Sequence, residues 1–461
     1  MRKVVQRVFS RLLALKTPPP RCPRAQYALP GFRVALTALV CLVCCPNLSA
    51  AGGKQLRPDS YGYFDFPTCV RYALVHSNAL TSSRIDIQLS SLDVKDAHSE
   101  LLPTIQLLTR YYLSRASSSS GESRINVHLF MTDWNPYLAL LKIKAGNILV
   151  DIAKTSHVSK IAEDTSTIAK TFYSIAMLER SIRAQQEMVA LQRNKVNYGK
   201  SLSEQGNADE LELRGLENSL RGMQIQVRSL KNRRDEEIAV LKRLIGYPPD
   251  HHLPLDTRDA VKQILAGFNG QTVTFPEIQA NNLMLKILAK KEQLQSNYVT
   301  GAYVSLLPRP LILFEDVQNQ VDRTSGFNLA LGVDYTLWDG FKRVREIKRQ
   351  KLNARLAEIK RTEASEELYG AFKKIRNVLQ LAGEEEAYSR EQANLAELAE
   401  EKAFLGYKSG AAAYDQYMSS RIQKLQAQMD ALKATEPRVL SLIELATIAG
   451  GLNRYNAGIR Y

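Results

Sequence analysis

The sequence predicts a mainly helical fold with membrane-type β-strands, in which long coiled-coil helical hairpins are joined to four strands per chain. Two proline-free stretches of roughly 65 residues have the apolar periodicity of coiled coils. Four short segments have the alternating or apolar-rich pattern of strands. The same order of features occurs twice along the chain, which indicates a tandem duplication.

Composition limits the class of protein before any motif is considered. The chain has 461 residues, a formal net charge of +15 and 45% hydrophobic residues. A chain this apolar buries enough surface to fold, which excludes bulk disorder. Beyond the N-terminus there is no uninterrupted run of the roughly 20 apolar residues that a transmembrane helix needs. An ordinary inner-membrane transporter is therefore excluded.

The N-terminal segment has the features of a secretory signal. Its basic residues, with no acid among them, are Arg2, Lys3, Arg7, Arg11, Lys16, Arg21, Arg24 and Arg33. An apolar run from Val34 to Cys45 follows, then Pro46 and small residues suited to a signal peptidase. The run is too short to span a bilayer, which argues against the alternative of a membrane anchor. We expect residues 1–50 to be a signal peptide, whose removal lowers the net charge to about +7.

Cysteine usage agrees with export. Four of the five cysteines lie in the expected signal peptide, so only Cys69 remains and no intrachain disulfide forms. The segment 42–45 is similar to the acylation signal of bacterial lipoproteins. Cys44, however, occupies the position where that signal has Gly, Ala or Ser. Lipidation at Cys45 remains an alternative to plain cleavage.

The remainder of the chain reads as two copies of one unit. Leu-Leu-Pro at 101–103 recurs at 306–308, and Gly206 recurs as Gly410, in each case about 204 residues later. Both tryptophans, Trp134 and Trp338, lie at equivalent positions. We expect residues 51–255 to form the first repeat and 256–461 the second. Each would contain short helices, two strands and a long helical hairpin.

The expected hairpins follow from heptad patterns. A seven-residue stripe runs along the first long helix, with a row of alanines beside it: Ile161, Ile168, Ile175, Ile182, Val189 and Val196, with Ala162, Ala169, Ala176 and Ala190. A helix of about 65 residues is on the order of 100 Å long. We expect Pro437 to kink the last helix. Helices alone would also fit a plain dimeric coiled coil.

The strands distinguish the two possibilities. One face of the segment 327–337 is apolar, whereas the other is small or polar: Phe327, Leu329, Leu331, Val333, Tyr335 and Leu337 form the face expected to point outward to lipid. A similar segment lies at 125–132, and partner strands are expected at about 104–113 and 311–318. Four strands cannot close a barrel of at least eight, so several chains must contribute. The alternative for any one segment is a half-buried strand of a soluble sheet.

In this order and spacing, the features resemble the TolC family of outer membrane efflux proteins over most of the chain, from about Phe64 to Gly451. The shared motifs are Leu-Leu-Pro before each strand pair, the Trp-Asp-Gly turn at 338–340, the Gly-Tyr-Lys-Ser-Gly segment at 406–410 and the Leu-Ile-Gly ending at 244–246. The resemblance implies a homotrimer with a 12-stranded outer membrane barrel and a helical tunnel that extends into the periplasm.

The resemblance also implies partners and a passive role. A periplasmic adaptor (membrane fusion) protein and an inner membrane pump would supply substrates and energy, as in tripartite efflux or type I secretion. The chain itself would conduct substrates through the outer membrane to the exterior, as a transport channel and not as an enzyme. No cofactor is implied.

The family closes its periplasmic entrance near the hairpin ends, which suggests gate residues here. Tyr407 matches the family's gating tyrosine, and Gly206, Gly406 and Gly410 mark the two hairpins. The family often has acids six and nine residues after the second glycine, where this chain has Gln416 and Ser419. In the first copy Glu212 follows Gly206 by six residues and is the better candidate for an acidic gate residue. A solvated helix charge is the alternative for Glu212.

Other residues carry weaker chemical signals. His251 and His252 are adjacent in a loop without spaced partners, so we expect no metal site. No P-loop, nucleophile elbow or dinucleotide fingerprint lies in the required context, and no catalytic or cofactor-binding residue is expected. The basic segment 342–351 follows a membrane strand, where solvent or lipid head groups explain it better than nucleic acid.

Two other classes of protein compete with a transport channel. A structural or adhesive coiled-coil protein of the cell envelope explains the helices but not the four strands. A soluble nucleic-acid-binding coiled coil explains the charge but not the export signal. Only the channel explains all of these features together.

Overall fold

The computed structural model describes residues 62–102, 105–111, 125–131, 135–205, 210–266, 273–318 and 325–450. The chain divides into two compact units, Met1–Ser60 and Tyr61–Tyr461, and every described residue belongs to the second. The expected signal peptide, with its lipidation alternative, lies outside the described residues. Side-chain positions are described for neither 103–134 nor 311–331.

The first half of this unit is built from two short and two long helical segments. These are α3 (Phe66–His76), α4 (Asn78–Ser99), α5 (Pro136–Glu204) and α6 (Glu210–Ile245). The Asp65 carboxylate accepts a hydrogen bond from the backbone N–H of Thr68, which caps α3. The Asn135 side chain caps α5 in the same way, and Pro136 occupies the first turn, where a missing N–H is tolerated. Local capping chemistry therefore sets where α3 and α5 begin.

The second half contains the remaining described helices. These are α7 (Ala260–Ile264), α8 (Phe275–Asn281), α9 (Leu283–Val304), α10 (Lys342–Lys408), α11 (Tyr414–Ala434) and α12 (Glu436–Ile448). The predicted kink at Pro437 is wrong, because the chain forms two separate helices there and not one bent helix. The helix ends at Ala434, and a new one starts at Glu436 with Pro437 in its first turn. A proline there removes no intrahelical hydrogen bond, so separate helices avoid the cost of a kink.

The strands form one antiparallel sheet in the order β1-β2-β3-β4. Their bounds are β1 (Ile105–Tyr111), β2 (Ile125–Met131), β3 (Arg309–Gln318) and β4 (Ser325–Asp334). The two hairpins of the sheet meet where Phe130 of β2 pairs with Leu313 of β3. The predicted strand, 327–337, begins and ends a few residues after the observed one. β4 ends at Asp334, and the exposed Tyr335 and Leu337 follow it. Phe327, Leu329, Leu331 and Val333 occupy alternating positions of the β4 backbone.

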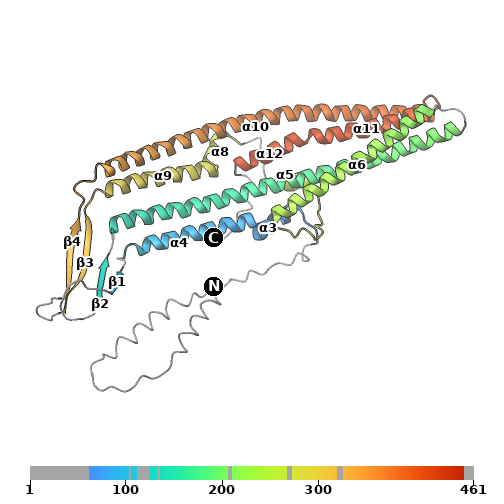
Figure 1. The fold of residues 1–461 in the computed structure, drawn as a ribbon. Coiled ribbons are helices and arrows are strands. Elements are labelled where there is room, and N and C mark those ends of the chain that lie inside the picture. Colours follow the sequence, from blue (N-terminus) through green and yellow to red (C-terminus); the bar gives the residue numbers. More distant parts are fainter. Residues whose placement is uncertain are drawn as a thin grey trace, which may run out of the picture. The chain divides into compact units, whose positions relative to one another are not determined.

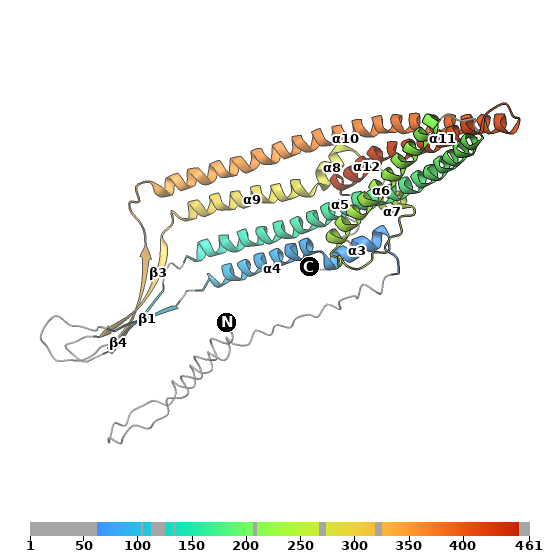
Figure 2. The ribbon, with the colours of Figure 1, turned by 45° about the vertical axis from the view of Figure 1, so that its right-hand side comes forward.

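Four helices lie side by side beyond the sheet, in the order α4, α5, α9, α10 (Figures 1 and 2). Further along, α6 and α11 take the places of α4 and α9 as neighbours. α6 packs against α5, and α11 packs against both α5 and α10. α10 is an outer helix throughout, and α5 is an inner one. Among the described helices, none is long and apolar enough to cross a membrane.

The main core lies where α3, α5, α6, α7 and α12 meet. Phe64, Phe172, Ile245, Ile264 and Ile443 are all completely buried there. The heptad prediction for α5 is confirmed at most positions, because Ile161, Ile168, Ile175, Ile182 and Val196 are buried. Val189 is only partly buried, and Ala190 is exposed. The apolar stripe of α5 therefore holds the two halves of the unit together.

Candidate functional site

The candidate site is the end of the second hairpin, where α10 turns back into α11. Gly410 has a φ of +77°, the left-handed conformation that commonly ends helices and favours glycine. The backbone N–H groups of Ala411 and Ala412 both donate to the carbonyl oxygen of Gly406, at 2.8 and 3.0 Å. A Cβ at Gly406 would approach that of Ala412 to 3.1 Å, so the tight turn favours both glycines.

Aromatic side chains surround this turn. Tyr407 of α10 stacks on Tyr417 of α11, with ring centroids 5.8 Å apart and planes inclined by 8°. It also meets Tyr414 edge-on at 5.6 Å. Tyr414 in turn contacts Tyr198 of α5, with centroids 4.8 Å apart. The predicted gate tyrosine is therefore part of a chain of rings that reaches from one hairpin to the other.

A lysine of the first hairpin provides a polar link to the second. The Nζ of Lys195 on α5 lies 2.9 Å from Asp415 Oδ1 and donates to Ser419 Oγ, also at 2.9 Å. The Lys195 side chain is only 11% exposed, whereas that of Asp415 is 49% exposed. A charged hydrogen bond is stronger when partly shielded from water. This contact, the Lys195 link, joins a predicted gate residue, Ser419, to the other half of the chain.

The face of α5 that meets α11 explains why Lys195 lies here. Met188 and Leu191 of α5 pack with Met418, Leu425 and Met429 of α11 in one apolar cluster. Lys195 and Tyr198 continue the same helical face toward the hairpin end, at spacings of three and four residues. The apolar seam therefore ends in the Lys195 link and the aromatic rings.

The other predicted gate residues are not brought together. Glu212 is exposed in the first turn of α6, and no described residue forms a hydrogen bond or ion pair with its side chain. A carboxylate there is favoured by the helix dipole, which agrees with the solvated-charge alternative. Gln416 is exposed on α11. Gly206 lies outside the described residues.

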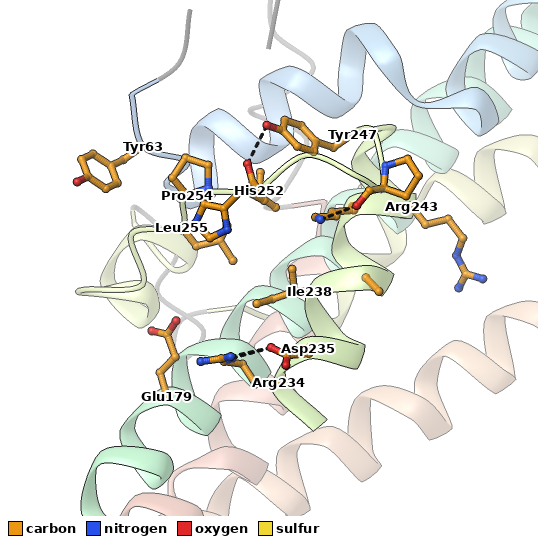
Figure 3. A pocket seen from close by; sticks show the side chains of 14 residues that line it. Tyr63, Glu179, Arg234, Asp235, Ile238, Arg243, Tyr247, His252, Pro254 and Leu255 are labelled. Atoms are coloured by element: carbon orange, nitrogen blue, oxygen red, sulfur yellow. Dashed lines mark hydrogen bonds and ion pairs between the residues drawn. The ribbon is translucent and has the colours of Figure 1, made fainter. Parts of the chain in front are cut away.

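A cavity of about 780 Å³ lies away from the hairpin ends, between α6 and the segment 247–255 (Figure 3). Most of its charged side chains are already engaged with protein groups. Arg234 pairs with Asp235, and Glu179 accepts a hydrogen bond from Thr257. His252 lines this cavity but His251 does not. Within the described part of the chain, no group of three or more His, Cys, Asp or Glu side chains could hold a metal ion.

Sequence reasoning missed Lys195 and Tyr198 as site residues. Their partners lie more than 200 positions away, and no local pattern predicts such a distance. The available signal was weaker: Asp415 is an acid in the first turn of a helix that carries the predicted gate residues. A search for a base on the facing helix would have needed the packing of α5 on α11.

Comparison with solved structures identifies the fold. The crystal structure of the outer membrane protein VceC from Vibrio cholerae matches with a TM-score of 0.66 at 12% identity, covering 84% of this chain and 96% of that one. The CmeC outer membrane channel of Campylobacter jejuni matches with a TM-score of 0.65 at 15% identity, covering 94% of both chains. The open state of the MtrE outer membrane channel of Neisseria gonorrhoeae gives 0.66 at 14% identity, covering 84% and 88%.

The similarity is carried by structure and not by sequence. No protein-family model and no curated protein matches this chain. The structural matches cover most of the length of each chain. This chain therefore has the fold of the TolC-family outer membrane channels.

Proposed function

We propose that this protein is an outer membrane exit channel that conducts substrates passively from the periplasm to the exterior. Three copies of its four-stranded sheet give a twelve-stranded barrel, and the helices continue it as a periplasmic tunnel. A periplasmic adaptor and an inner membrane pump deliver the substrates, in efflux or in type I secretion. The chain contributes no catalysis and needs no cofactor, because conduction breaks no bond.

One observation carries the proposal: both the sheet and the helical layer are open at their two sides. β1 and β4 each have a neighbour on one side only within the described sheet. Exposed strand edges are costly in a membrane, and closure with other copies satisfies them. The helical layer is likewise bounded by α4 or α6 on one side and by α10 on the other. A ring of copies closes both parts at once.

The outer membrane location rests on three supports. These are the expected signal peptide at 1–50, the apolar face of β4 and the outer membrane channels that share this fold. The apolar face consists of Phe327, Leu329, Leu331 and Val333, and in this proposal it faces lipid. Tyr335 and Leu337 continue this series beyond the strand.

The hairpin ends form the periplasmic gate in this proposal. The Lys195 link and the Tyr407 ring contacts hold the second hairpin against the first, and this arrangement is the closed state. Glu212, Gln416 and Ser419 lie on the two returning helices, near their first turns. Opening requires α11 to move away from α5, which breaks the contacts of Lys195 with Asp415 and Ser419.

The function is tested by localising and reconstituting the protein. The protein should fractionate with the outer membrane, and the purified trimer should conduct ions across a planar lipid bilayer. A structural or adhesive coiled-coil protein would show no conductance. Absence of both barrel insertion and conductance would reject the channel.

The gate is tested separately by removing the Lys195 link. Lys195→Met should raise the single-channel conductance, because it removes both contacts to α11 while keeping the length of the side chain. Lys200→Met is the matched control, since Lys200 pairs with Glu217 within the first hairpin. The double variant Glu212→Gln/Tyr407→Phe tests the residues expected from sequence. Lys200→Met should leave the conductance unchanged. Unchanged conductance in both Lys195→Met and the double variant would reject the gate and leave the channel intact.

A further inference from the structure

The two sides of the helical layer carry matching stripes next to the sheet. On α4 the stripe consists of Ile85, Leu89, Leu92 and Asp96, spaced four, three and four residues apart. The three apolar side chains are 49, 55 and 50% exposed. The buried or half-buried positions of α4, which include Leu80 and Ala97, lie on the opposite side of the helix. The stripe therefore faces away from α5.

The stripe on α10 has a similar order. It consists of Arg345, Lys348, Leu352, Leu356 and Ile359. Its apolar members are 59, 49 and 45% exposed. The less exposed residues of this part of α10, such as Ile347 and Ala354, lie on the side that packs against α9. Most of this stripe therefore faces away from α9, whereas Leu356 lies at its edge and also lines a pocket with Leu149 of α5 and Leu294 of α9.

Direction and charge make the two stripes complementary. α4 runs toward the sheet and α10 runs away from it, so Asp96 and the pair Arg345 and Lys348 all lie at the sheet-side ends of their stripes (Figures 1 and 2). Three apolar residues follow on each helix in the direction away from the sheet. An antiparallel pairing of the stripes therefore places an acid near two bases, and apolar residues opposite apolar residues.

The charged residues of the two stripes lie at helix ends where the helix dipole disfavours their charge. Asp96 is in the last turn of α4, close to the negative end of the helix dipole. Arg345 is close to the positive end of α10, whose first turn contains no acid. No hydrogen bond or ion pair joins the side chains of Asp96, Arg345 or Lys348 to another described residue. These exposed charges are therefore available to a partner outside the chain.

We infer that the α4 stripe of one copy packs against the α10 stripe of the next copy, with Asp96 paired with Arg345 and Lys348. The contact is head-to-tail, because it joins two different surfaces, and such a contact gives a ring when the rotation between successive copies closes, as in the proposed trimer. The apolar residues provide most of the buried area, and the charges fix how far the helices slide along each other. This inference rests on the proposed oligomeric channel and names the surface that closes it.

A charge-reversal cycle tests the pairing in the purified full-length protein. Asp96→Lys, and separately Arg345→Asp/Lys348→Asp, should each weaken trimer formation about tenfold by native mass spectrometry. Combining the three substitutions should restore most of the trimer, because the exchanged charges again attract each other. Asp86→Lys is the control, since Asp86 is exposed on α4 outside the stripe. Losses that simply add in the combined variant would overturn the pairing.

Cross-linking provides a second readout that does not depend on trimer strength. Cysteines introduced by Leu92→Cys/Leu352→Cys should form disulfides between chains, because both positions lie in the apolar part of the stripes. Leu92→Cys/Leu398→Cys is the control, since Leu398 lies in the hairpin part of α10. Trimers without the specific cross-link would refute the surface but keep the channel. A monomeric wild-type protein would refute the proposed function as well.

Discussion

The helices α5 and α10 have nearly the same length but opposite environments. α5 has 69 residues, of which 24 are buried. α10 has 67 residues, and its buried residues are Phe372, Ile375, Ala382 and Glu386. Both helices have apolar residues at heptad spacing, and the difference lies in the number of neighbours. α5 packs between other helices, whereas α10 keeps one side free within a single chain.

This contrast shows that the apolar residues of α10 are incompletely used by one chain. Leu381, Tyr388 and Leu395 recur every seven residues and are 56, 68 and 49% exposed. A single chain gains little from such residues, whereas a neighbouring copy would bury them. The stability of α5 therefore depends on the chain itself, and we expect that of α10 to depend on assembly.

The largest expected effect comes from placing charges on the free side of α10. Leu381→Glu/Leu395→Glu should abolish the trimer, since two unpaired carboxylates would be buried at the contact between copies. Size-exclusion chromatography with light scattering measures the loss, and circular dichroism should show retained helices. The control Lys373→Glu changes a charge on α10 outside this row, since Lys373 is eight and not seven residues before Leu381. A trimer that survives the leucine substitutions would show that this side of α10 is not a contact.

The reverse behaviour is expected for a buried residue of α5. Phe172→Ala should lower the free energy of unfolding by about 3–5 kcal/mol, because the ring is completely buried in the main core. Chemical denaturation followed by circular dichroism measures this change. Tyr388→Ala on α10 is the comparison and should change the stability of the isolated chain by less than about 1 kcal/mol. Equal losses of unfolding free energy in Phe172→Ala and Tyr388→Ala would show that α5 and α10 do not differ in how much they contribute to the stability of a single chain.

Two glycines with similar backbone angles sharpen the comparison at the helix ends. Gly246 after α6 has a φ of +75°, and an added Cβ would lie 2.3 Å from the carbonyl oxygen of His76. Gly410 after α10 has a φ of +77° with no described atom within 4 Å of such a Cβ. Gly410→Ala should therefore lower the free energy of unfolding by only about 1 kcal/mol, the cost of the left-handed backbone conformation. Gly246→Ala should lower it clearly more, because the backbone at His76 must move to make room for the added Cβ. Thermal unfolding of the two variants checks this order.

The smallest expected effect is a pH dependence at the contact of α4 with α5. His157 is completely buried, with Nδ1 3.1 Å from Ser83 Oγ, and burial together with the nearby Arg84 lowers the pKa of the imidazole. Below a pH of about 6.5 the unfolded chain gains this proton before the folded chain does. Stability should therefore fall as the pH drops through this range and stop falling below the folded pKa.

Comparison with His157→Gln isolates this contribution. The melting temperature of the variant should decline less between pH 7 and pH 5 than that of the wild type. His98→Gln is the control, because His98 is exposed at the end of α4. Parallel pH profiles for wild type and His157→Gln would contradict the assignment.

Local chemistry made most of the elements predictable. Heptads without proline indicated the long helices, and alternation indicated strands within a few residues of those observed. Glycines and prolines marked the ends, although Pro437 starts a helix instead of bending one. These features are readable because they depend on neighbours within four residues along the chain. The roles of Tyr407, Glu212, Gln416 and Ser419 remain predictions.

Only the tertiary structure decided which distant residues meet and which surfaces stay open. It brought Lys195 to Asp415 and Ser419, and it paired Glu386 of α10 with Arg438 of α12. It also placed α5 inside the layer and α10 at its side, although their sequence patterns are alike. A heptad specifies that a helix face will be covered, but not by which partner. That choice depends on how all the helices pack, and no single segment contains this information.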